Sequence, residues 1–168
     1  MTEAMRTQAK TIVVGLGEFK VTREPSVILI CLGLGSCVSV CAYDPLVKLG
    51  GMAHIVLPSS NGRAEEASAK YADKGVPLLL EEMFKQGAMR SHLIIKLAGG
   101  AALSKAPGLE SAFKIGERNL EMVQAVLAKE RISTAAADVG GHMGRTVRMF
   151  LDSGKVVVTT AGSETRVL

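Results

Sequence analysis

The sequence predicts an α+β fold, a layered sandwich in which two main helices cover a mixed, largely antiparallel β-sheet. Short apolar runs rich in β-branched residues and bounded by Gly or Pro outnumber helical segments by roughly seven to two. Only two segments place apolar residues at helical spacing. The chain has 168 residues, of which 48% are hydrophobic and 21% charged, so it is long enough for one buried core and has an ordinary globular composition.

The predicted strands in the first third of the chain follow these short runs: residues 11–14, 26–32, 37–43 and 52–57. The last two are expected to pair through the turn at Asp44-Pro45, because Asp and Pro favour chain reversal. This pairing places Cys37 at the mouth of a strand, directly after a glycine-rich turn.

A helix is predicted over residues 73–85. Asp73 is the expected N-cap, and Gly87 is expected to end the helix. Pro77 is placed in the first turn, where the missing N–H matters least.

The second half of the chain begins with a predicted buried strand, followed by a long loop over residues 99–114, which length alone predicts to be functional or mobile. A second helix is predicted over residues 117–129. Arg118 and Asn119, in its first turn, either attach that loop to the sheet or face a substrate. The remaining predicted strands are residues 93–98, 132–139, 146–151 and 155–160.

Composition and charge narrow the class of protein. The net charge is +4, but aromatic residues make up only 4% and Trp is absent, so a nucleic-acid partner is not expected. The polar segment 1–10 lacks the apolar centre of a secretory signal. The chain contains no run of 18 apolar residues, so membrane insertion is not expected. Three cysteines, an odd number, favour free thiols in the cytoplasm. We expect a polar N-terminal segment, residues 1–10, and a single domain, residues 11–168.

Cys37 and His54 are the candidate catalytic pair. A thiol of ordinary pKa is mostly protonated at neutral pH, so a nucleophilic cysteine needs an imidazole or converging backbone N–H groups nearby. Gly35 and Ser36 precede Cys37 and offer such N–H groups as an oxyanion hole. Taken alone, Cys37 is better explained as an inert buried thiol, and His54 is equally well explained as a core histidine; only their combination makes a nucleophile and base as good an interpretation.

Two other kinds of site are disfavoured. The Gly33-Leu34-Gly35 turn lacks the third glycine of a dinucleotide-binding fingerprint. The chain has no CxxC or HExxH motif, so neither a metal nor a cofactor is expected. His92 and His142 lie next to chain reversals and are interpreted as surface residues.

Several short blocks, in a consistent order from about residue 12 to residue 160, resemble the CheD family of chemoreceptor glutamine deamidases. The matching blocks are Leu34-Gly35-Ser36-Cys37-Val38, Asp44-Pro45, Gly51-Met52-Ala53-His54 with Leu57-Pro58, Lys70-Tyr71-Ala72-Asp73, Lys96-Leu97-Ala98-Gly99-Gly100-Ala101, Ile115-Gly116-Glu117-Arg118-Asn119, and Asp138-Val139-Gly140-Gly141 with Gly144-Arg145.

The resemblance implies a fold similar to the catalytic domain of the cytotoxic necrotizing factor toxins. It implies that the substrates are glutamine side chains in the cytoplasmic domain of methyl-accepting chemotaxis receptors, and that CheC-type phosphatases are partners. Cys37 matches the family nucleophile and His54 the family histidine. The third family residue is a threonine, and Cys31 stands at its position. Because a thiol accepts hydrogen bonds weakly, the orientation of His54 is expected to be looser or to depend on another group.

The residue types imply a thioester mechanism, in which Cys37 attacks the carboxamide and His54 transfers the protons. Two alternatives stay open. One is a CheD-like docking protein with little activity that regulates a CheC-type phosphatase or a receptor, which the Cys31 departure favours. The other is a cysteine peptidase or thioesterase that uses the same pair.

Overall fold

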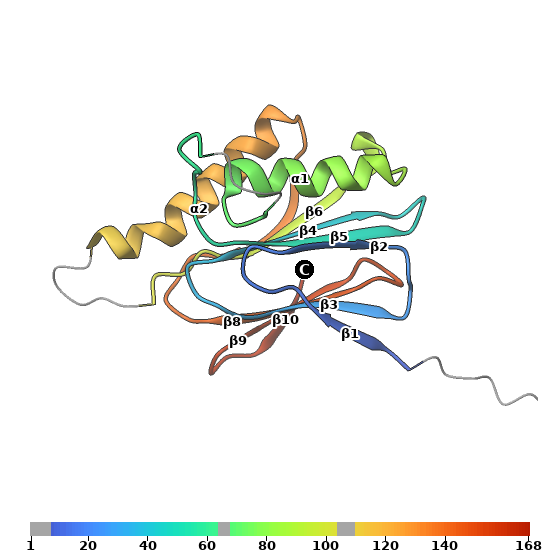
Figure 1. Ribbon diagram of the computed structural model, residues 1–168. Coiled ribbons are helices and arrows are strands. Elements are labelled where there is room, and N and C mark those ends of the chain that lie inside the picture. The colour runs from blue at the N-terminus through green and yellow to red at the C-terminus, as the bar shows by residue number, and fades with distance from the viewer. Residues whose placement is uncertain (1–7, 64–67, 104–109) are drawn as a thin grey trace, which may run out of the picture.

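The computed structural model describes residues 8–63, 68–103 and 110–168, with the side chains of 110–113 excepted. In this part of the chain, ten strands form two five-stranded sheets, and two α-helices cover one of them. Figure 1 shows the resulting three layers: helices, a central sheet and an outer sheet. The predicted α+β class with two main helices is confirmed, and the strands divide between two mixed sheets.

The central sheet lies between the helices and the outer sheet (Figure 1). Its strands, in spatial order, are β2 (Phe19–Thr22), β5 (Leu49–Ile55), β4 (Val38–Asp44), β6 (Ile94–Gly99) and β7 (Thr134–Val139). The β4 strand runs antiparallel to both neighbours, whereas β6 and β7 are parallel. Every residue of β4 and β5 is buried, because both faces of these strands are covered.

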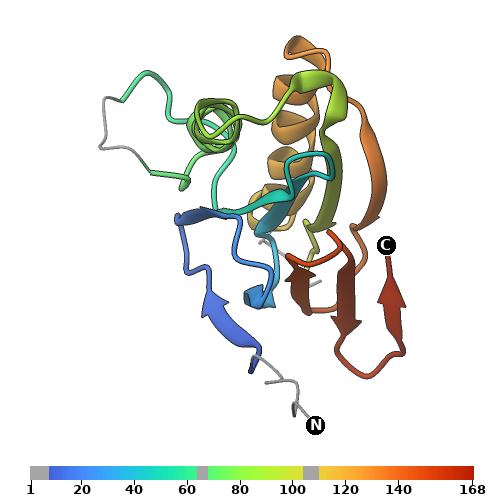
Figure 2. The same ribbon diagram turned by 90° about the vertical axis from the view of Figure 1, so that its right-hand side faces the viewer.

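The outer sheet closes the other side of the molecule, as the turned view in Figure 2 shows. Its strands, in spatial order, are β1 (Lys10–Val13), β3 (Val27–Leu34), β8 (Arg145–Phe150), β9 (Val156–Thr160) and β10 (Thr165–Val167). Burial alternates along β8, as expected for a strand with one face on the core and one toward solvent.

Two hydrophobic cores hold the layers together. One lies between the central sheet and the helices α1 (Ala72–Lys85) and α2 (Glu110–Lys129), with Leu79, Met83 and Leu127 among its buried residues. The other lies between the two sheets and includes Cys31, Cys41 and Met52. A short 3₁₀ turn, η1 (Arg90–His92), leads from α1 toward β6.

The structure corrects several predicted boundaries. The α2 helix begins at Glu110 instead of residue 117, so the end of the predicted loop 99–114 is helical, while residues 104–109 lie outside the described residues. The strands β2 and β10 were not predicted from the sequence, because four and three residues give too little alternation to recognise.

The start of α1 also differs from the prediction. Tyr71 is the N-cap and makes no side-chain capping bond. Asp73 is instead the second helical residue, and its carboxylate accepts hydrogen bonds from Ser60 N at 2.9 Å and Ser60 Oγ at 2.8 Å. Pro77 is the sixth helical residue and therefore lies in the second turn. Gly87 follows the helix end with a φ of +106°, as predicted for a terminating glycine.

Candidate active site

Cys37 lies where the chain crosses from the outer sheet to the central sheet. Residues 35–37, here called the Cys37 loop, join β3 to β4. The Cys37 side chain is half-buried and packs against the core between the two sheets. The sulfur is therefore neither sealed in the interior nor fully in water.

His54 comes from the neighbouring strand and shares a face with Cys37. In the β4–β5 ladder, His54 pairs directly with Ser39. Side chains alternate along a strand, so Cys37, two residues before Ser39, continues the face to which Ser39 and His54 belong. Diagonal neighbours on one face of an antiparallel pair are about 7–8 Å apart, within reach of a His and a Cys side chain that point toward each other.

The imidazole of His54 is buried and held through one nitrogen. Nδ1 lies 3.0 Å from the Val14 carbonyl oxygen, which can only accept, so Nδ1 carries the proton. Nε2 is buried and has no hydrogen-bond partner among the described residues, Cys37 Sγ included. The ring thus presents an unshared electron pair at Nε2, as a general base requires.

The thiol of Cys37 is not ionised by its surroundings alone. Burial raises its pKa, and the smaller opposing effect of the Cys37 backbone N–H does not compensate. The neutral thiol is therefore the resting form, and attack on a substrate requires a base to remove the proton.

Cys31 lies on β3 and faces the same core from the opposite sheet. It is fully buried, and its Sγ lies 3.8 Å from the Val14 carbonyl oxygen and 3.4 Å from Met52 Sδ. Burial raises the pKa of this thiol far above its ordinary value. Cys31 and His54 thus meet the same backbone carbonyl, and no hydrogen bond between their side chains is found in the described residues.

The backbone carbonyls of the Cys37 loop are each held by a hydrogen bond. The Ala101 N–H donates to Gly35 O and the Gly100 N–H to Cys37 O, both at 2.8 Å. Residues 99–102, here called the Gly99 turn, therefore fix two of the three carbonyls.

Asn119 of α2 holds the third carbonyl of the loop. Its Nδ2 donates to Ser36 O and to Val56 O, both at 2.9 Å, and the residue is fully buried. Of the two alternatives that the sequence left open, the structure supports neither as stated, since Asn119 attaches the Cys37 loop to the end of β5. The sequence singled out Asn119 but did not reveal its two carbonyl partners, because both are distant along the chain.

Glycine is required where these segments approach each other. A Cβ added at Gly99, whose φ is +110°, would lie 2.2 Å from Cys37 O. A Cβ added at Gly116 of α2 would lie 2.6 Å from Ala101 O. Close approach of three backbones therefore shapes the site.

A largely buried ion pair also contacts the Gly99 turn. Arg145 Nε lies 3.0 Å from Asp138 Oδ1, and its Nη1 donates to Gly99 O at 3.3 Å. In the sequence, both residues stand in the blocks that match the family. Their pairing depends on β7 and β8 lying in different sheets, which sequence spacing did not reveal.

The two other histidines do not join the site. The exposed His142 has Nδ1 2.9 Å from Ala102 O, and the partly exposed His92 has Nδ1 3.6 Å from Asp44 Oδ2. In the described part of the chain, no group of three or more His, Cys, Asp or Glu residues could hold a metal ion.

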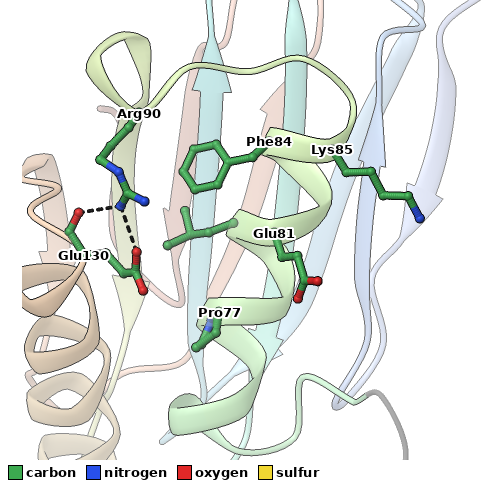
Figure 3. Close-up of a pocket in the computed structure, with 7 residues that line it drawn as sticks. Pro77, Glu81, Phe84, Lys85, Arg90 and Glu130 are labelled. Atoms are coloured by element: carbon green, nitrogen blue, oxygen red, sulfur yellow. Dashed lines mark hydrogen bonds and ion pairs between the residues drawn. The ribbon is translucent and has the colours of Figure 1, made fainter.

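A cavity of about 600 Å³ lies elsewhere, at α1, η1 and the end of α2. Figure 3 shows Phe84 next to Arg90, whose Nη1 forms an ion pair with Glu130 Oε2 at 2.8 Å, and Pro77 further along α1. None of the lining residues belongs to the segments around Cys37 and His54. We therefore do not assign the chemistry to this cavity.

The fold is a three-layer α+β sandwich, and its candidate site combines a cysteine in a tight loop with a histidine that one hydrogen bond holds on the covered central sheet. The family model described as CheD chemotactic sensory transduction matches residues 56–160. Together with the relatives described next, this match shows that the chain belongs to the CheD family.

Three relatives align over most of their length. A protein of Symbiobacterium thermophilum, named a probable chemoreceptor glutamine deamidase CheD, is 48% identical over 89% of this chain and 92% of its own. A protein of the same name from Syntrophomonas wolfei is 43% identical over 95% and 99%. The chemoreceptor glutamine deamidase CheD of Thermotoga maritima is 43% identical over 89% and 92%.

Solved structures add little. The crystal structure of the hypothetical protein YfiH of Bacillus licheniformis matches 80% of this chain and 59% of its own at 13% identity, with a TM-score of 0.40. That likeness is too weak to support an argument, and the expected similarity to the toxin catalytic domain stays a prediction. Within the described residues, no helix has the length and apolar character needed to cross a membrane.

Proposed function

We propose that the protein is a chemoreceptor glutamine deamidase that converts glutamine side chains of methyl-accepting chemotaxis receptors to glutamate and releases ammonia. The observation that carries the proposal is that His54 Nε2 has no hydrogen-bond partner in the described part of the chain, on the face of the central sheet that Cys37 also joins. The names of the relatives support the substrate.

The proposed reaction begins with proton transfer from Cys37 to His54 Nε2. The thiolate attacks the carboxamide carbon, and backbone N–H groups at Gly35, Ser36 and Cys37 stabilise the oxyanion. The protonated imidazole gives its proton to the departing ammonia, leaving a thioester. Water, deprotonated by the same imidazole, hydrolyses the thioester to a carboxylate and returns the thiol. The reaction needs no cofactor.

Exposed apolar side chains near the loop supply a surface for a helical receptor segment. Leu103, which is 60% exposed, covers the Cys37 loop so closely that a Cβ at Gly35 would lie 2.4 Å from its Cδ1. Leu16 and Leu32, 70% and 52% exposed, belong to the turn that leads to β2 and to the strand that enters the loop. Such side chains are suited to the apolar stripe of an amphipathic helix.

The decisive experiment is incubation of the protein with a receptor cytoplasmic fragment, followed by mass analysis of the peptides and measurement of ammonia. Cys37→Ser and His54→Ala are each expected to lower the rate by about 100-fold or more, as for loss of a nucleophile or general base. Cys41→Ala removes a buried thiol from β4, the strand that follows the Cys37 loop, and is expected to keep the rate.

Wild-type rates in Cys37→Ser or His54→Ala would contradict the mechanism. Cleaved receptor backbone would indicate a peptidase, and a receptor of unchanged mass would exclude receptor deamidation.

A second candidate is a docking protein with little activity that regulates a CheC-type phosphatase or a receptor. The raised pKa of Cys37 and the cysteine at position 31 favour it. In that case, Cys37→Ser would leave the affinity for the partner unchanged, and no variant would affect receptor mass. A CheC-type phosphatase is the proposed partner under either function.

A further inference from the structure

We propose that Asn119 is a positioning residue, which orients the Cys37 amide through its hydrogen bond to Ser36 and holds the Cys37 loop against the strand that carries His54. The inference rests on the proposed function and assigns the role of a residue that does not touch the reacting atoms.

The contacts of Asn119 use its donors only. Both Nδ2 contacts end on carbonyl oxygens at 2.9 Å, so the amide nitrogen must face them. The Oδ1 atom is buried without a hydrogen-bond partner among the described residues. Asn119 therefore acts at this position through its two donated hydrogen bonds, while its buried acceptor contributes none.

The first hydrogen bond sets the direction of the Cys37 amide. In a trans peptide, the C=O and N–H groups point to opposite sides. Asn119 draws Ser36 O toward α2, so the N–H of the same peptide, which belongs to Cys37, points away from that helix. That N–H lowers the pKa of the Cys37 thiol, against the larger effect of burial, because an N–H directed at the sulfur favours the thiolate.

The second hydrogen bond connects the loop to the histidine strand. Val56 lies two residues after His54, directly beyond the end of β5. One nitrogen atom therefore joins the backbone next to Cys37 with the backbone next to His54. A change at Asn119 is expected to shift both groups relative to each other.

Asn119 is also the only side chain among the three groups found to hold the loop carbonyls. Gly35 O and Cys37 O accept from backbone N–H groups at 2.8 Å, which a substitution does not remove. Without Asn119, the ends of the loop stay attached and the central peptide is free to rotate.

The test compares Asn119→Asp and Asn119→Ala with Val123→Ala. The Asp variant keeps the shape of the side chain but lacks the two N–H donors. Val123 is buried on the same helix, one turn further on, and does not hold the loop, so Val123→Ala reproduces a loss of stability alone. All four proteins are measured at a temperature where circular dichroism shows them folded.

Two measurements are made on each protein. The first is kcat and KM for a receptor fragment. The second is the rate of iodoacetamide alkylation of Cys37 against pH, without substrate and with the modified residue assigned by mass spectrometry. Cys31 and Cys41 react slowly, because they are buried and burial raises their pKa, that of Cys41 to about 11.

We expect both Asn119 variants to lower kcat by about 10- to 100-fold with little change in KM. The midpoint of alkylation is expected to rise by about half a pH unit, since the thiolate loses an oriented amide. Val123→Ala is expected to match the wild type in both.

The proposal is overturned if the Asn119 variants show the wild-type alkylation profile, or if Val123→Ala reproduces their changes at equal loss of thermal stability. Absence of deamidation by the wild type would refute the proposed function, while the alkylation profiles would still decide the role of Asn119.

Discussion

At the scale of single residues, the orientation of His54 depends on a backbone carbonyl. Val14 O accepts from Nδ1 at 3.0 Å, and Nε2 has no partner within residues 8–63, 68–103 and 110–168. The family resemblance places a threonine where Cys31 stands, and the weak acceptor capacity of a thiol predicted either a looser imidazole or another source of orientation. The Val14 carbonyl supplies it, and the Cys31 sulfur contacts the same oxygen at 3.8 Å.

Replacement of Cys31 by threonine is therefore expected to keep the deamidation rate within about threefold, because Val14 O holds the imidazole in either protein. Threonine is also well tolerated in a strand. Steady-state ammonia release from a receptor fragment measures the effect, with Cys31→Ala as the control for lost packing. A fall of about 100-fold in folded Cys31→Thr, the size of a general-base contribution, would show that Cys31 has a role of its own.

At the scale of elements, the Gly99 turn and α2 form the support of the Cys37 loop. Gly100 and Ala101 donate to the loop, Gly140 N donates to Gly99 O at 2.9 Å, and α2 lies directly against the turn at Gly116. This contact needs a helix without a side chain at that point. A glycine inside a helix is normally unfavourable by about 1 kcal/mol, so its presence indicates a packing requirement.

Gly116→Ala is expected to lower stability by about 1–3 kcal/mol in spite of the gain in helix propensity, because the new methyl group would meet the Ala101 carbonyl. Displacement of the turn should also lower deamidase activity. Urea unfolding and ammonia release are the measurements. Glu117→Ala, at an exposed position of the same helix turn, is the matched control and should change neither. A more stable and fully active Gly116→Ala protein would refute the packing argument.

At the scale of the whole molecule, Asp44 connects the helix layer to the central sheet. Its carboxylate is buried and accepts hydrogen bonds from Leu46 N and Met89 N, both at 2.9 Å. Burial acts to raise the pKa of Asp44, but the backbone N–H groups of Met89, Leu46 and Val47, together with His92, outweigh it and lower the pKa. The Asp44 carboxylate thus connects the turn after β4 to the segment after α1, because backbone N–H groups of both donate to it.

Asp44→Asn is expected to lower the free energy of unfolding at pH 7 by about 1–3 kcal/mol, because an amide replaces an ionised acceptor. Since the folded pKa lies below the ordinary value of about 3.9, the stabilisation is present above that pH and is lost as pH falls through the folded pKa. Urea unfolding of both proteins between about pH 7 and pH 3 should show their difference shrinking toward acid. A constant difference would contradict the assignment of the charge.

Sequence alone determined the features that depend on local chemistry. The two apolar runs that contain Cys41 and Met52 predicted two strands. The spacing of Leu79, Leu80 and Met83 predicted α1, because burial of one helix face follows directly from periodicity. The same local logic singled out Cys37 after a glycine turn and His54 on the adjacent apolar run.

Only the tertiary structure decided how distant segments meet. The strands divide into two sheets that lie in different layers. The hydrogen bond from His54 Nδ1 to Val14 O and those from Asn119 to Ser36 O and Val56 O join residues 40 to 83 positions apart. Such contacts depend on which backbone groups are left unpaired when the layers pack. Local spacing carries no record of that outcome, and the support of the candidate site therefore became visible only in the folded chain.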